Sequence, residues 1–388
     1  MKIIHVVASL DPAQGGPARS MPSLAAAQAK LGHDVTLFYN AAPGRMEDIK
    51  VATASIPHFD LVNTVTCPQP DGLEKLTGNR AGRIFKTILD KNAVIHIHGL
   101  WLPILQKAAS LSIKQGAKYI IAPRGMLNPW SLNQKSWKKR LALHLVWRRI
   151  LNHAFFLHVL NADEKKFITS LNLNCPMEII PNGIFPEELN NLPPENRFYN
   201  FFPRIKNRPY ILFLGRLHEM KGLDYLAEAF NEFVKKNNDV DLVVAGPDEG
   251  ARDNFEKQID HYGIKKRVHL VGPLYGVKKY AAFVDAKCFC QPSREEGFSM
   301  ASAEAMGCGL PVVISKNCHF PEVAEAGAGE VVDLDAKAIS RALHRVLGNE
   351  DERVKMGEVA QKLVLSRFTW PNIAKGTIAA YKRGSANK

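Results

Sequence analysis

Long apolar runs and closely spaced cysteines are both missing from this sequence of 388 residues. No stretch approaches the roughly 20 apolar residues that a membrane-spanning helix requires. The first apolar run, MKIIHVVASL, is short and precedes Asp11-Pro12, which is typical of a first β-strand and not of a signal peptide. The six cysteines form no CxxC pair and mostly lie among apolar residues, as reduced, buried thiols do. We therefore expect a cytoplasmic protein without a disulfide framework.

The sequence also lacks repeats of solenoid length, a GxGxxG dinucleotide fingerprint and a recognisable basic module for nucleic acid. Apolar residues make up 46% and charged residues 23%, the range of soluble globular proteins, which gives no case for disorder. The formal net charge is +13, of which residues 1–200 carry +9. This excess favours an anionic partner: a nucleic acid, a phosphorylated small molecule or an acidic membrane surface. Without a basic module, we expect no nucleic-acid partner.

Short β-rich runs alternate with amphipathic stretches in both halves of the chain, which predicts two α/β domains with parallel sheets. The length agrees, since 388 residues exceed what one hydrophobic core usually holds. A Pro- and Asn-rich stretch, 190–209, is the predicted linker. The expected strands are 3–8, 35–39, 93–97 and 119–122 in the first half, and 210–214, 242–245, 268–271, 288–291 and 311–314 in the second.

Two glycines, Gly15 and Gly16, lie between the first expected strand and Pro17, which opens the first expected helix. Ligands of open parallel sheets bind beyond the carboxyl ends of the strands, so residues at this position are informative. Bare backbone N–H groups at a helix N-terminus could face a phosphate or a sugar. An ordinary glycine-rich turn is an equally good interpretation.

His96 and His98 alternate with Ile97 at the end of an expected strand, so both histidines point to one face of the sheet. His98, nearer the strand end, could reach a ligand. We expect no metal site here, because no third ligand of suitable spacing is nearby in the sequence. A pair of hydrogen-bonded histidines at a sheet edge is the alternative.

Arg216 follows the strand 210–214, and Lys221 stands five residues further on. Both cations could converge on one anionic group. A diphosphate leaving group needs its growing negative charge neutralised, and an Arg fork with a Lys point charge could do this without a metal ion. Surface cations on a solvated turn are the alternative.

Two carboxylates, Glu296 and Glu304, follow the strand 288–291 with seven residues between them. If a helix begins near Ser299, Glu296 lies on the loop before it and Glu304 on its second turn. Carboxylates accept hydrogen bonds from paired hydroxyls, and free amides at a helix start bind phosphate oxygens. Stabilisation of the helix dipole is the alternative, but Glu304 lies deep in an apolar helix. The amides expected at the helix start belong to Phe298, Ser299 and Met300.

The segments EGFSMASAE, GRLHEMKG and AMGCGLPVV together resemble retaining glycosyltransferase family four, the group 1 glycosyltransferases. The elements GGPARS, HIHGLW and IPNGI extend the resemblance over nearly the whole chain, and PRGML at 123–127 is similar to a group acting on bacterial surface glycans. The resemblance implies the GT-B fold: two Rossmann-like domains that face each other across a cleft. They would occupy 1–190 and 205–367, with a C-terminal helix, 368–388, that crosses back to the first domain.

On the donor side, the resemblance implies that Arg216 and Lys221, with Gly215, hold the diphosphate and that Glu304 binds the ribose. The amides of 298–300 would hold the transferred sugar. Ser299 departs from the family, which often has Gly at this position; this matters little if only the backbone N–H is used.

For the sugar and the acceptor, the resemblance implies that Glu296 positions the transferred sugar and that His98 lies beside it. Gly15 and Gly16 would approach the diphosphate and the acceptor, and Arg124 is a candidate on the acceptor side. Retention in this family is ascribed to same-face attack, in which a leaving phosphate oxygen takes the acceptor's proton. A dedicated protein base is then unnecessary. The implied catalytic residues are His98, Arg216, Lys221 and Glu296.

The function implied is retaining transfer of a hexose-type sugar from a nucleotide diphosphate sugar to a glycan or lipid-linked acceptor. The resemblance places the reaction in bacterial surface polysaccharide or glycolipid biosynthesis, with no cofactor and no metal. The donor base, UDP, GDP or ADP, stays open. A GT-B-fold sugar-nucleotide epimerase and a non-catalytic sugar-nucleotide-binding protein are the alternatives; only a transferase makes nucleoside diphosphate release depend on acceptor.

A basic, apolar segment at 135–149 predicts peripheral contact with an anionic membrane. Trp137, Leu141 and Leu145 recur at helical spacing and could form one apolar stripe, with Trp147 nearby. Such a basic helix is typical of a membrane interface, and here it would bring the first domain to a lipid-linked acceptor at the inner face of the plasma membrane. Packing of the stripe on the sheet is the alternative. The segment has no acidic residue, and its cations are Lys135, Lys138, Lys139, Arg140, Arg148 and Arg149.

Overall fold

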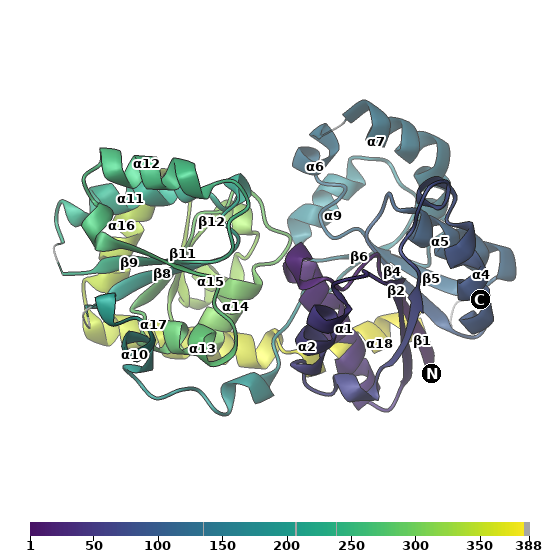
Figure 1. The fold of residues 1–388 in the computed structure, drawn as a ribbon, viewed down its shortest axis with the longest axis horizontal. Helices are drawn as coiled ribbons and strands as arrows, with labels where there is room; N and C mark the ends of the chain where they lie inside the picture. The colour runs from purple at the N-terminus through teal and green to yellow at the C-terminus, as the bar shows by residue number, and fades with distance from the viewer. Residues whose placement is uncertain (135, 206–207, 238, 384–388) are drawn as a thin grey trace. The chain divides into compact units, whose positions relative to one another are not determined.

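The computed structural model describes residues 1–134, 136–205, 208–237 and 239–383, which form two compact units (Figure 1). Unit 1 consists of Met1–Asn182 and the last helix, α18 (Trp370–Arg383); unit 2 consists of Gly183–Thr369. The chain therefore leaves unit 1 once and returns to it for its final helix. The described part of the stretch 190–209 lies inside unit 2, where Phe198 belongs to the core.

Unit 1 is built on a parallel sheet whose strand order reverses between β1 and β4. This is the order of a Rossmann domain, and the reversal marks the place where such domains bind ligands. His96 and His98 lie on the central strand β4, so the alternative of a histidine pair at a sheet edge was wrong. The described strands, in spatial order, are β3 (Asn63–Cys67), β2 (Asp34–Asn40), β1 (Lys2–Val6), β4 (Val94–His98), β5 (Lys118–Ala122), β6 (Leu157–Val159) and β7 (Met177–Ile179).

Helices lie on both faces of the unit 1 sheet, which buries its strands on both sides. The first of them begins at Gly16, one residue before the predicted start at Pro17. Besides α18, the helices of the described part of unit 1 are α1 (Gly16–Lys30), α2 (Met46–Ala54), α3 (Glu74–Thr77), α4 (Asn79–Ile88), α5 (Pro103–Gln115), α6 (Pro129–Asn133), α7 (Ser136–Ala142), α8 (Arg148–Asn152) and α9 (Ala162–Thr169).

Unit 2 repeats this plan with a parallel sheet that reverses its order between β8 and β11. Apolar strands such as YILFL of β8 are buried along their length, as expected of a sheet covered on both faces. Each Phe or Leu buried in this way contributes about 1.5–3 kcal/mol. In spatial order the described strands are β10 (Val268–Gly272), β9 (Asp241–Ala245), β8 (Tyr210–Leu214), β11 (Cys288–Gln291), β12 (Val312–Ser315) and β13 (Gly329–Val332).

Two groups of helices cover the unit 2 sheet, one on each face (Figure 1). The helix predicted to begin near Ser299 does so, with Ser299 as its N-cap. One face carries α11 (Leu223–Val234), α12 (Arg252–His261) and α16 (Ala336–Leu347). The other carries α10 (Arg197–Phe201), α13 (Gly276–Asp285), α14 (Met300–Gly307), α15 (Glu322–Ala326) and α17 (Glu350–Arg367).

The basic segment of unit 1 runs through α7, a π-helical turn (Leu143–Trp147) and α8. Trp137, Leu141 and Leu145 are 67%, 51% and 67% exposed, so the alternative that this stripe packs on the sheet is wrong. Trp147 is buried against the ring of Trp101. Lys135, counted among the cations, lies outside the described residues. Within the described ranges, no helix is both long and apolar enough to cross a bilayer.

Candidate active site

The residues expected to bind the donor lie at the carboxyl ends of β8 and β11, which pair across the order reversal of unit 2. Arg216 and Lys221 follow β8, and Glu296 follows β11. Topology therefore brings together segments that are about 75 residues apart, as expected for ligand sites of this fold.

Close backbone packing holds the two loops against each other. Gly222 has φ +66°, and a Cβ atom there would lie 1.8 Å from the carbonyl oxygen of Pro292. Only glycine permits this approach without displacement of the backbone. The neighbouring Lys221 thereby reaches Glu296 and forms an ion pair with it.

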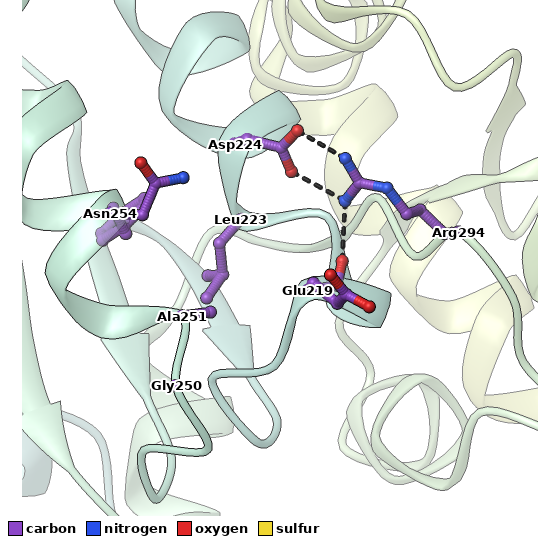
Figure 2. Close-up of a pocket in the computed structure, with 8 residues that line it drawn as sticks. Glu219, Leu223, Asp224, Gly250, Ala251, Asn254 and Arg294 are labelled. Carbon is purple, nitrogen blue, oxygen red and sulfur yellow. Dashed lines mark hydrogen bonds and ion pairs between the residues drawn. The ribbon is translucent and has the colours of Figure 1, made fainter. Parts of the chain in front are cut away.

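Arg294 also links the two loops, through hydrogen bonds to Met220 and Asp224. Its backbone N–H donates to Met220 O at 2.8 Å, and its guanidinium binds both oxygens of Asp224 at 2.8 and 2.5 Å. Figure 2 shows this bidentate pair and the further bond to the carbonyl of Glu219. A cavity of about 300 Å³ lies beside this pair. Two carboxylates and one guanidinium line it, and this net negative charge does not suit a diphosphate.

Glu296 has one carboxylate oxygen fixed and the other open. Oε1 accepts hydrogen bonds from Lys221 Nζ, from Gln291 Nε2 at 2.7 Å and from Ser293 Oγ at 2.8 Å. Among the residues that the structure describes, none donates a hydrogen bond to Oε2. The side chain is thus held rigidly while one oxygen stays available to a hydroxyl group.

Gln291, at the end of β11, connects Glu296 to the start of α14. Its amide oxygen accepts from Ser299 Oγ at 2.5 Å and from Ser302 Oγ at 3.0 Å, while its nitrogen donates to Glu296. Ser299 Oγ also accepts from the N–H of Ser302 and so caps the helix. Ser299 therefore contributes its side chain as well as its backbone. Gln291 was missed from the sequence, although a polar residue at the end of an otherwise apolar strand was the available signal.

The helix start leaves amide groups open, as predicted. No hydrogen bond within the described residues engages the backbone N–H of Phe298 or Ser299. The ring of Phe298 packs against Phe320 at 5.3 Å between centroids, and Met300 packs against the same core. These side chains anchor the segment that carries the two amides.

Glu304 is buried to 7% exposure on α14 and forms an ion pair of 2.9 Å with Lys279 of α13. An unpaired carboxylate in this position would be costly, and the ammonium of Lys279 provides the partner. The sequence analysis did not identify Lys279, which lies 25 positions before Glu304 in an ordinary amphipathic helix.

Arg216 is partly exposed and binds Glu249 at 2.5 Å. Gly215 precedes it, and its carbonyl oxygen would lie 1.8 Å from a Cβ at Gly246, so a second backbone approach shapes this turn. Both candidate donor cations, Arg216 and Lys221, are thus held by carboxylates, which a diphosphate would have to replace.

In unit 1, Gly15 and Gly16 form the turn into α1, with Gly15 at φ 76° as the N-cap. His98 and Arg124 lie together: the guanidinium Nη2 is 3.1 Å from His98 Nδ1, and Nη1 donates to Asn182 Oδ1 at 2.8 Å. Burial lowers the pKa of His98 well below its usual value and that of Arg124 to about 10.

The third histidine that the sequence analysis could not find is His5 of β1, which is the register partner of His96. His5, His96 and His98 each place one ring nitrogen within 4.8 Å of the others. They are 91 and 93 positions apart in the sequence, so only the pairing of β1 with β4 reveals the group.

Comparison with known proteins agrees with this architecture. Residues 15–183 match the glycosyl transferase 4-like domain, and residues 196–363 match the glycosyl transferases group 1 domain. An uncharacterized glycosyltransferase of Methanocaldococcus jannaschii is 32% identical over 212 residues, which are 53% of this chain and 54% of that protein. The chain spans about half the length of the curated relatives it matches.

Two solved structures share the fold over the full length of both chains. Sucrose-phosphate synthase of Thermosynechococcus elongatus superposes with a TM-score of 0.78 at 20% identity, and 100% of each chain is covered. The Anabaena protein HepE in complex with UDP-glucose gives 0.74 at 19% identity, again with 100% of each. At such identities the likeness shows the GT-B fold alone. Because the two matched domain families follow one another through both units, the chain belongs to the group 1 glycosyltransferases.

Proposed function

We propose that this protein transfers a sugar from a nucleoside diphosphate sugar to an acceptor, with retention of configuration and without a metal ion. The observation that carries the proposal is the ion pair of Lys221 with one oxygen of Glu296, which leaves the other oxygen open next to a cation. The open oxygen of Glu296 can accept a hydrogen bond from a sugar hydroxyl, and Lys221 beside it can bind a phosphate. HepE, which shares the fold, was solved with UDP-glucose, and this supports a nucleotide-sugar donor.

The chemistry follows from the charges. In the transition state the sugar gains positive charge while the departing diphosphate gains negative charge. Arg216 and Lys221 stabilise the diphosphate, and the buried Glu304 binds a hydroxyl pair on the ribose. Glu296 fixes the sugar and does not act as a base, because Lys221 and Gln291 keep its carboxylate bonded on one side.

The direct test is removal of one cation at a time. Arg216→Ala and Lys221→Ala are each expected to lower turnover by a factor of about 100 or more. Arg252→Ala, which removes an exposed cation of the same unit, serves as the matched control. Normal turnover in either folded site variant would contradict the assignment.

Two further measurements separate the alternatives. Chelator should leave the rate unchanged, and an absolute requirement for Mg²⁺ or Mn²⁺ would contradict the metal-independent scheme. Release of nucleoside diphosphate should require acceptor. A new sugar nucleotide formed without acceptor would favour an epimerase, and donor binding without any turnover would favour a non-catalytic binding protein.

For the acceptor we propose a lipid-linked glycan, reached by docking of unit 1 on an anionic membrane surface. The stripe of Trp137, Leu141 and Leu145 is exposed, and Lys138 and Arg140 stand exposed beside it. Residues 91–162 contain no acidic residue at all. Exposed aromatic and aliphatic side chains among cations suit the interface of anionic lipid, where each cation adds about 1 kcal/mol.

Co-sedimentation with anionic and neutral liposomes at two salt concentrations tests this surface. Binding to anionic vesicles should weaken with salt and should be lost in Leu145→Ser, because burial of that side chain in lipid supports docking. Leu76→Ser, which alters an equally exposed leucine elsewhere in unit 1, should bind normally. Failure of the unaltered protein to bind either vesicle would favour a soluble acceptor.

A further inference from the structure

Four histidines of unit 1 are buried next to one another, three of them on the two strands that flank the order reversal of the sheet. Neighbouring ring centroids lie between 4.2 and 5.2 Å apart. The resemblance to the group 1 glycosyltransferases implies a role in the reaction for only one of them, His98. The four are His5 of β1, His96 and His98 of β4, and His158 of β6.

Hydrogen bonds join these rings into a chain that begins at Arg124. Its Nη2 lies 3.1 Å from Nδ1 of His98, and Nε2 of His98 lies 2.8 Å from Nδ1 of His5. Nε2 of His5 then lies 2.8 Å from Oε1 of Gln28, a fully buried residue of α1.

The second half of the chain passes through Tyr381 of α18 and ends at a backbone carbonyl. Gln28 Nε2 donates to Tyr381 OH at 3.3 Å, and this hydroxyl lies 2.6 Å from His96 Nδ1. His96 Nε2 is 3.1 Å from His158 Nδ1, and His158 Nε2 is 2.7 Å from the carbonyl oxygen of Ile180.

The two ends decide where every proton lies. A guanidinium only donates, so His98 must accept at Nδ1, and a neutral imidazole then carries its proton on Nε2. His98 Nε2–H therefore donates to Nδ1 of His5, so His5 also carries its proton on Nε2. This Nε2–H donates to the amide oxygen of Gln28. The amide NH₂ group of Gln28 donates to the hydroxyl oxygen of Tyr381. The hydroxyl of Tyr381 in turn donates to Nδ1 of His96.

The other end of the chain, the carbonyl oxygen of Ile180, independently places the ring protons on Nε2. A carbonyl oxygen only accepts, so His158 must carry its proton on Nε2 and accept at Nδ1, which requires Nε2–H on His96. Burial supports the neutral state, because it lowers the pKa of all four rings, to about 4 for His5. An added proton on any ring would set two donors against each other.

The same arrangement argues against a metal ion at His5, His96 and His98. Each ring has a single lone pair in the neutral state, and a donor already occupies it: Arg124, His98 or Tyr381. The guanidinium beside His98 also repels a cation.

We infer that these groups form one hydrogen-bond chain with a single direction, in which all four histidines are neutral with the proton on Nε2, and that Gln28 positions His98 through His5. The part concerning His98 in catalysis rests on the proposed function; the placement of the protons does not. In this chain both nitrogens of His98 are engaged, so the ring serves the reaction by its position and not by proton transfer.

Nitrogen NMR of histidine side chains tests the placement of the protons in the full-length protein. With ¹⁵N-labelled histidine and assignment by single substitutions, all four rings should show the Nε2–H tautomer at pH 7. Addition of Co²⁺ should leave their signals unchanged. A charged ring, an Nδ1–H tautomer among the four, or broadening of His5, His96 and His98 by Co²⁺ would overturn the inference.

Gln28→Met tests the positioning role, because it keeps the side-chain length and removes both polar groups. Because Arg124 still donates to Nδ1 of His98, His5 and His98 should keep the Nε2–H tautomer. Their signals should nevertheless shift, since Nε2–H of His5 loses its acceptor, and kcat should fall by up to about 100-fold at unchanged donor KM. Tyr381→Phe should shift the signals of His96 without a change of tautomer, since the carbonyl of Ile180 still fixes His96 and His158 and Arg124 still fixes the other two rings. Thr377→Val, which removes a buried hydroxyl of α18 outside the chain, is the control.

The NMR signals and the enzyme activity test different claims and can be interpreted separately. An inactive protein with four Nε2–H rings would contradict the proposed transfer reaction and leave the chain intact. Unchanged kcat and unchanged His5 and His98 signals in folded Gln28→Met would overturn the positioning role. Should that variant fail to fold, the tautomers of the unaltered protein still test the direction of the chain.

Discussion

Glu304 binds a cation in the structure, yet its expected partner in the reaction is a pair of ribose hydroxyls. Glu304→Gln should weaken donor binding, because an amide offers one acceptor where the carboxylate offers two. We expect the donor KM to rise by roughly 10–100-fold with a smaller change in kcat, measured by steady-state kinetics.

Glu358→Gln, at an exposed position of the same unit, is the matched control and should leave KM unaltered. A KM that stays fixed in folded Glu304→Gln would mean that the ribose is bound elsewhere and that the ion pair with Lys279 is structural.

Individual residues were predictable where chemistry and spacing coincide in the sequence. The two glutamates and the two cations share short segments, so their roles follow from a local pattern. Gln291, Lys279 and His5 carry no such pattern, because their partners arrive through strand pairing or helix packing. The roles assigned to the predicted residues stay predictions until the variants are measured.

The loop between β8 and α11 depends on one glycine. Gly222→Ala should lower the free energy of unfolding of unit 2 by about 1–3 kcal/mol more than Gly263→Ala. Gly263 has nearly the same positive φ, +69° against +66°, but its Cβ would meet no atom within 4 Å. The comparison therefore isolates the contact with Pro292 from the cost of the left-handed conformation.

Chemical denaturation monitored in unit 2 gives both values. Because Lys221 is the next residue, Gly222→Ala should also displace the ion pair with Glu296 and reduce turnover. Equal stability of the two alanine variants would show that the loops can separate without cost.

The bounds of a strand were predictable where the strand is a long apolar run. β8 and β11 begin and end where the sequence placed them, since buried parallel strands are continuous apolar runs. β6 and β7, with three residues each, are too short to give a pattern, and the polar β3 offers none. The helical pattern of residues 135–149 was recognised, but which side faces solvent depends on tertiary packing.

Unit 1 should lose stability in mild acid. Its four buried histidines are neutral when folded, with pKa values below the unfolded value of about 6.5, so the unfolded state binds more protons as pH falls. Their contribution is complete above pH 6.5 and decreases from there towards pH 4, the pKa of His5. Each ring adds up to about 1.4 kcal/mol per pH unit.

Urea denaturation of unit 1 between pH 4.5 and 8 measures this slope. His5→Gln should reduce it, whereas His153→Gln, at an exposed position, should not. A free energy of unfolding that stays constant across this range would mean that the rings are charged or solvated in the folded protein.

The two-domain architecture was predictable because the βα alternation occurs twice. The GT-B fold is confirmed, whereas the expected cleft between the sheets stays a prediction. The return of the last helix to unit 1 was predicted from the sequence, within two residues of Trp370. The boundary at Asn182 was harder to infer, since prolines after Asn190 suggested a linker inside what is unit 2.

The return of α18 to unit 1 also sets an order of events on the ribosome. Unit 2 is one continuous segment and can fold as soon as it has emerged, but unit 1 must wait for a helix made 187 residues after its first segment ends. At usual rates of synthesis this is a delay of roughly 10–40 s. Until Tyr381 arrives, Gln28 and His96 remain without their shared partner in a nascent chain. The N-terminal unit, although made first, is therefore completed last.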